Sequence, residues 1–106
     1  MIGRQHGQLA TVFYKGVSLD TMQKIKKSNI IKGRVVKKAG RVFMGVYLSK
    51  SPKVAQAYGD YVLIIDGTGL YIVKSPHSNQ FIAIGDISAS KIIKSVRVEK
   101  DGEDFE

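Results

Sequence analysis

The apolar positions at the start of the chain predict a strand followed by a helix. The β-branched and aromatic residues at 11–14 predict a short strand. Ser18 comes next and has the type of side chain that is preferred at a helix N-cap. Apolar residues then recur every three positions, which predicts a helix that buries one face and ends near residues 28–29. The residues of this face are Leu19, Met22 and Ile25.

A second helix is predicted to begin at Ser51. The Ser51 hydroxyl can cap the helix, and Pro52 stands at the first helical position, where proline is favoured. Gly59 is the residue type that often ends a helix, so we expect this helix to continue to about that position. The apolar residues at 42–48 predict a strand directly before it.

The second half of the chain has the pattern of strands. The unbroken apolar run at 61–65 predicts a central strand that is covered on both faces. Residues 66–69 have the composition of a turn, and we expect residues 70–73 to return beside the preceding strand as a hairpin. Further strands are expected at 80–84 and, at the edge of the sheet, at 91–98. Two helices and about six strands predict an α+β fold with a mainly antiparallel sheet.

Length and composition agree with one domain. The chain has 106 residues, of which 43% are hydrophobic and 25% charged, enough for one globular core. We expect a flexible arm at 1–10, a domain at 11–98 and an acidic tail at 99–106. The chain has no cysteine, which excludes disulfides and thiolate metal sites. The only histidines, His6 and His77, have no second ligand at metal spacing, so we expect no metal site.

The chain shows neither an export signal nor a membrane span. No apolar run follows Met1, and the longest one, at 61–65, is far shorter than the roughly 20 residues that a spanning helix needs. We therefore expect a cytoplasmic protein without a membrane partner.

Positive charge is concentrated in one segment. The 17 bases and 9 acids give a net charge of +8, and between Asp20 and Asp60 there are ten bases and no acid. Within this segment, residues 32–41 predict a loop or a weak hairpin. Such a block is either a solvated face or a site for phosphates or for an acidic protein. The candidate partner-binding residues are Lys24, Lys27, Lys32, Arg34, Lys37, Lys38 and Arg41.

Three segments of the chain, in order, resemble the ADP-ribosyltransferase family. Residues 12–18 resemble the family's opening strand, which typically reads apolar-Tyr-His-Gly-Thr. Residues 45–59, with Tyr47 in a strand and a helix rich in small residues after it, are similar to the second motif. Residues 79–83 look like the start of the strand that carries the family's catalytic Glu. Together the resemblance covers about residues 11–98.

This resemblance implies a fold, a cofactor and a set of site residues. The fold is a single compact α+β domain with a split, mainly antiparallel sheet and two short helices. The family cleaves the nicotinamide–ribose bond of NAD with a His, a Tyr that stacks on nicotinamide, and a Glu that supports the cation-like ribose. Those positions hold Lys15, Tyr47 and Gln80, the candidate catalytic residues. The candidate cofactor-binding residues are Tyr14, Lys15, Gly16, Tyr47, Ser49 and Tyr58.

Two of these positions depart from the family pattern. Lys15 is a flexible point charge where the family has a flat ring. Gln80 has no charge to set against the cation, and the loss of one such group typically costs about 10² to 10³ in rate. These departures leave open whether the protein is an enzyme.

Two functions follow from this resemblance. The first is a small ADP-ribosyltransferase-like protein that binds NAD and transfers ADP-ribose to a nucleic acid or a protein. The alternative is an inactive module of the same fold that binds nucleic acid or an acidic protein through its basic surface, as an inhibitor encoded by a mobile element would. An RNA 2′-phosphotransferase relative ranks last, because the sequence lacks a matching cluster of His and Arg.

Overall fold

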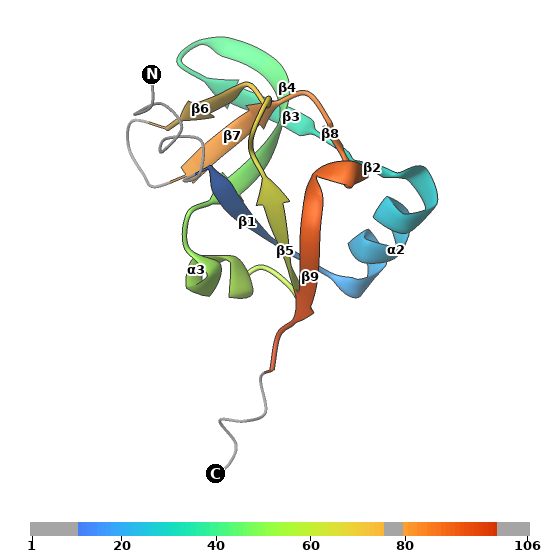
Figure 1. Cartoon of the computed structure of the whole chain (residues 1–106). Helices are drawn as coiled ribbons and strands as arrows, with labels where there is room; N and C mark the ends of the chain where they lie inside the picture. The colour runs from blue at the N-terminus through green and yellow to red at the C-terminus, as the bar shows by residue number, and fades with distance from the viewer. Residues whose placement is uncertain (1–10, 76–79, 100–106) are drawn as a thin grey trace, which may run out of the picture.

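The computed structural model describes residues 11–75 and 80–99. Its helices are α2 (Leu19–Ser28) and α3 (Pro52–Gln56), and one turn of 3₁₀-helix spans Ala89–Lys91 (Figure 1). Its strands are β1 (Val12–Val17), β2 (Ile30–Ile31), β3 (Arg34–Lys38), β4 (Arg41–Ser49), β5 (Tyr61–Asp66), β6 (Ile72–Lys74), β7 (Gln80–Ile84), β8 (Ile87–Ser88) and β9 (Ile92–Arg97). No helix in the described part of the chain is long and apolar enough to cross a membrane.

The strands form one large antiparallel sheet that divides where β1 meets β4. Seven strands belong to it, in the order β6-β7-β4-β1-β5-β9 with β3 also beside β4, while β2 and β8 form a separate pair. β1 pairs with β5 along its whole length but with β4 only at Tyr14↔Ser49. Because β7 takes one side of β4, β3 and β1 share the other side and leave a gap between them. The predicted α+β domain with a mainly antiparallel sheet and two helices is confirmed.

The main core lies between α2 and one face of the sheet. Alternate residues of β1 and β5 point to this face, and α2 covers it with one apolar side. Burying a large apolar side chain contributes about 1.5–3 kcal/mol, so this face supplies much of the stability. Its buried residues include Phe13, Val17, Met22, Ile25, Leu63 and Ile65.

α3 packs on the opposite face of β1. A Cβ at Gly16 would collide with the backbone oxygen of Ala55, so the absence of a side chain at Gly16 is what allows α3 to approach. Ala55 itself is buried. The two helices therefore lie on opposite faces of β1, β5 and β9 (Figure 1).

Both predicted helix starts are confirmed, because the capping signals are local. The Ser18 hydroxyl accepts a hydrogen bond from the backbone N–H of Thr21 at 3.1 Å. The Ser51 hydroxyl accepts one from Val54 N–H at 3.2 Å. The predicted end of α3 at Gly59 is wrong, since the helix ends at Gln56. Gly59 instead lies against the backbone of β1, where a Cβ would clash.

The predicted apolar face of α2 is only partly correct. Met22 and Ile25 are buried, but Leu19 is 50% exposed. An α-helix turns by about 100° per residue, so steps of three residues drift, and Leu19 lies about 120° around the helix from Ile25.

The predicted hairpin between residues 61–65 and 70–73 is wrong. The turn itself forms, and the backbone N–H of Thr68 donates to Asp66 Oδ1 at 2.9 Å. However, β6 pairs with β7, while β5 lies between β1 and β9. Turn residues reverse the chain without selecting the strand that it joins next.

Residues 32–41 were predicted to form either a loop or a weak hairpin. They form β3 and the turn of a β3–β4 hairpin. Ala39 and Gly40 make the turn with positive φ values of 51° and 76°, and Lys38 pairs with Arg41. β7 pairs with β4 only from Gly45 onward. Among the described residues, the first part of β4, residues 41–43, therefore has β3 as its single partner strand.

The remaining strand predictions hold with small shifts. The strand at 61–65 is β5, and it is covered on both faces because the adjacent residues Val62 and Leu63 are both buried. The strand at 80–84 is β7, and the last strand, β9, lies at the sheet edge as expected. The predicted arm lies outside the described residues, as does the predicted tail apart from Glu99.

Candidate functional site

A cleft opens where the sheet divides between β1 and β4. It consists of two adjoining cavities that share Lys15, Gly16, Arg34, Tyr47 and Tyr58 in their walls. We call them the α3 cavity, of about 710 Å³, and the α2 cavity, of about 800 Å³, after the helix that borders each. Both volumes are within the range of small-molecule sites, about 300–1,000 Å³.

All of the candidate catalytic and cofactor-binding residues line the α3 cavity. Three of them form a row across three strands, because Tyr14 pairs with Ser49 and Ser49 pairs with Gln80. Tyr47 lies two residues before Ser49 and shares its face of β4. The full set is Tyr14, Lys15, Gly16, Tyr47, Ser49, Tyr58 and Gln80.

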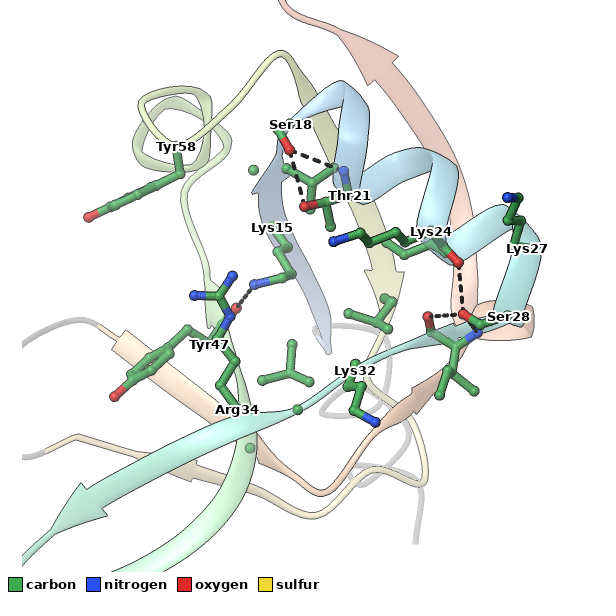
Figure 2. Close-up of a pocket in the computed structure, with 18 residues that line it drawn as sticks. Lys15, Ser18, Thr21, Lys24, Lys27, Ser28, Lys32, Arg34, Tyr47 and Tyr58 are labelled. Carbon is green, nitrogen blue, oxygen red and sulfur yellow. Dashed lines mark hydrogen bonds between the residues drawn. The ribbon is translucent and has the colours of Figure 1, made fainter.

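Lys15 occupies a position that the strand pattern would give to an apolar residue. It lies between Phe13 and Val17 on the core face of β1 and pairs with the fully buried Leu63. Its Nζ donates to the backbone oxygen of Tyr47 at 3.4 Å (Figure 2). No carboxylate among the described residues forms an ion pair with it.

The electrostatic setting of Lys15 favours an anion. Burial lowers the pKa of Lys15, and the positive charge of Arg34 lowers it further. A negatively charged ligand between these two cations would relieve both effects, because it would stabilise the protonated lysine. Arg34 was predicted as a partner-binding residue, but it lines both cavities beside Lys15.

Two tyrosines provide aromatic surface at the junction of the cavities. Tyr47 comes from β4, and Tyr58 follows α3 and is 68% exposed. Figure 2 shows both rings on the same side of the cleft. Exposed aromatic faces can stack on a planar ring such as a nucleobase or nicotinamide.

The Ser49 hydroxyl is engaged in hydrogen bonds to the backbone of Ser51. It accepts a hydrogen bond from Ser51 N–H at 2.9 Å and lies 3.2 Å from the Ser51 oxygen, to which it donates. These bonds shape the entry into α3. Ser49 therefore contributes to the cavity mainly by placing α3 against it.

Among the described residues, neither cavity has an aspartate or glutamate in its wall. Asp86 is the nearest acid in sequence after Gln80, and its Oδ1 accepts a hydrogen bond from Gly33 N–H at 2.7 Å. Gln80 thus presents a neutral amide where the family resemblance implies a carboxylate. The described residues of the cleft can hold an anion but offer no negative charge to a developing cation.

The candidate partner-binding residues separate into two groups. Lys24, Lys27, Lys32 and Arg34 line the α2 cavity. Lys37, Lys38 and Arg41 lie on the β3–β4 hairpin and line neither cavity.

Other lining residues were missed by the sequence reasoning. Phe81 and Lys50 line the α3 cavity, and Lys50 Nζ lies 4.7 Å from the centroid of the Phe13 ring. Thr21 and Ser28 line the α2 cavity. These four residues had no distinct signal in the sequence, unlike the predicted Lys15, whose charge interrupts the buried face of β1.

No metal centre is evident in the part of the chain that the structure describes. It contains no group of three or more histidine, cysteine, aspartate or glutamate side chains placed to hold an ion. The two histidines, His6 and His77, lie outside this part.

Comparisons of the chain with protein-family models, with curated proteins and with solved structures found no match. The function of the cleft is therefore inferred from its own residues and geometry.

Proposed function

We propose that this protein binds NAD in the α3 cavity. The observation that carries the proposal is that one cavity gathers every residue assigned to NAD by the family resemblance. Tyr47 would stack on the nicotinamide ring, and Lys15 would bind a ribose oxygen or a phosphate. Gln80 would bond to the hydroxyls of the second ribose.

The chemistry of the lining favours binding over cleavage. Breaking the bond between nicotinamide and ribose leaves positive charge on the ribose carbon, which a carboxylate would stabilise. The described walls of both cavities have no carboxylate, and two cations, Lys15 and Arg34, stand nearby. We therefore propose that transfer of ADP-ribose is at most slow.

The second candidate function is a catalytically inactive module of the same kind, whose partner is a nucleic acid or an acidic protein. The observation that favours it is that the described lining of the cleft contains no acid, while the α2 cavity has several cations. An NAD titration separates the two functions: chemical shifts around Tyr47 support the first, and no shifts together with no free nicotinamide support the second.

An NMR titration with NAD tests the proposal. Chemical shifts of residues around Tyr47 should move, and the Tyr47→Ala variant should bind NAD about 5- to 150-fold more weakly, since stacking on an aromatic ring contributes about 1–3 kcal/mol. Tyr71→Ala is the matched control, because Tyr71 is 73% exposed and lines neither cavity. An absence of shifts, or equal losses in both variants, would refute NAD binding here.

A further inference from the structure

The α2 cavity adjoins the proposed NAD site and extends beyond it along α2. It lies between α2 on one side and the segment that runs from β2 into β3 on the other (Figure 2). Its walls combine apolar and cationic side chains. Ile25, Ile31 and Val46 are buried and form apolar wall, whereas Lys24, Lys27 and Lys32 are exposed.

The charge of this cavity is one-sided. Five of its lining residues are cationic: Lys15, Lys24, Lys27, Lys32 and Arg34. No acid lines it. Two carboxylates come near. Asp20 forms an exposed ion pair with Lys24 at 3.6 Å, and Asp86 is engaged with the backbone of Gly33. An exposed pair of this kind contributes little and leaves Lys24 available to another anion.

The cations also differ in position. In Figure 2 the ammonium of Lys24 points across the cavity toward the side where Lys15 and Arg34 lie, whereas Lys27 at the end of α2 and Lys32 on the opposite wall direct their amino groups outward. Positive groups therefore lie inside the cavity, at Lys15, Lys24 and Arg34, and at its rim, at Lys27 and Lys32. A ligand that matches this arrangement carries several negative charges in a row.

We infer that the α2 cavity binds a segment of single-stranded nucleic acid, with successive phosphates along these lysines and its end directed to Lys15 and Arg34. A strand supplies regularly spaced anions, and a base can stack on the exposed ring of Tyr58, which lines the cavity at its junction. The cavity has the volume of a small-molecule site, which takes a short stretch of one strand and not a duplex. This inference rests on the second candidate function, for which it names the ligand class, and it does not require NAD to bind.

The salt dependence of binding tests this assignment. A labelled oligothymidine is titrated at several salt concentrations with the whole chain and with Lys24→Gln, Lys27→Gln and Lys32→Gln. For single strands, the slope of log K against log salt is about −0.7 per cation that contacts a phosphate, so each substitution should reduce it by about 0.7. The matched control is Lys26→Gln, which removes the same charge from the same helix but lies outside the cavity wall.

Three outcomes would overturn the inference. One is no binding of the oligothymidine at low salt. Another is an equal loss in Lys26→Gln and in the cavity variants, which indicates a diffuse basic surface. The third is tighter binding of a duplex, or of a polyglutamate peptide, than of the single strand, which assigns the surface to a different class of partner. An NAD titration of Lys32→Gln distinguishes the two sites, because that variant should bind the oligonucleotide more weakly and bind NAD as the parent does.

Discussion

Lys15 and Arg34 are two cations that come from different strands and line the same junction between two cavities, where no described residue of the walls carries a carboxylate. The charge of Arg34 contributes to the lowered pKa of Lys15. Such an arrangement costs stability in the free protein, because like charges are held together near apolar surface. Its presence points to a ligand that supplies the missing negative charge.

Lys15→Met should stabilise the free protein and weaken NAD binding. Methionine has a similar shape and places an apolar group beside Leu63, without the cost of a buried charge. In a domain of this size, each kcal/mol gained raises Tm by roughly 4–8 °C. Thermal unfolding and an NAD titration of the same sample check both effects. A variant that is less stable than the parent would contradict the electrostatic account.

The pH dependence of stability follows from the same residue. The native pKa of Lys15 lies below its ordinary value of 10.5, so in that interval the unfolded chain binds more protons than the native protein. Stability from this group therefore rises with pH through the interval. The difference in free energy of unfolding between the parent and Lys15→Met should shrink as the pH approaches 10.5. Paired urea unfolding curves at neutral and alkaline pH measure it.

Gln80→Glu should increase the release of nicotinamide from NAD. The change puts a carboxylate where the cavity now has a neutral amide, beside Ser49 in the β4–β7 register. One electrostatic group of this kind is typically worth about 10² to 10³ in rate. Gln23→Glu is the control, since Gln23 is exposed on α2 and lines neither cavity. Equal rates of nicotinamide release in the two variants would place Gln80 away from the ribose.

Gly16→Ala should disturb both the fold and the α3 cavity. The new methyl group would meet the Ala55 oxygen and push α3 from β1, at a cost of about 1–3 kcal/mol for overpacking. Tyr58 would move with the helix, so NAD binding should weaken as well. Gly40→Asn is the comparison, because nothing lies within 4 Å of a Cβ there and asparagine tolerates its positive φ. Chemical denaturation reports the first effect, and the NAD titration reports the second.

Leu63→Ala should be the most damaging of the simple truncations. Leu63 is fully buried in β5, and removing most of its side chain leaves a cavity that typically costs about 2–5 kcal/mol. Val42→Ala, at a position that is 67% exposed, should change the free energy of unfolding by about 0.5 kcal/mol or less. Similar losses in the free energy of unfolding of the two variants would contradict the assignment of Leu63 to the core.

The sequence predicts this fold where the determining signals are local. The N-caps Ser18 and Ser51 act within three residues of themselves, so both helix starts could be predicted. The partner of β6 could not be predicted. Strand pairing depends on which strand is free at the sheet edge, and the turn at 66–69 does not determine it.

Some residues of the candidate site could likewise be predicted from the sequence, and others could not. The family resemblance selected residues that prove to line one cavity, since the motifs follow strands whose register brings Tyr14, Ser49 and Gln80 into one row. The approach of Arg34 to Lys15 had no sequence signal. It arises because β3 and β1 lie on the same side of β4, a property of the topology alone.

The β3–β4 hairpin has a consequence for the behaviour of the protein at high concentration. Residues 41–43 have one partner strand among the described residues, and Val35 and Val42 are largely exposed, so this edge is open to association with another copy. The same hairpin carries Lys37, Lys38 and Arg41. Repulsion between these cations in two copies opposes association through the strand edge. Added salt screens this repulsion. Ionic strength should therefore set the colloidal stability of the protein, and concentrated samples are best kept at low salt.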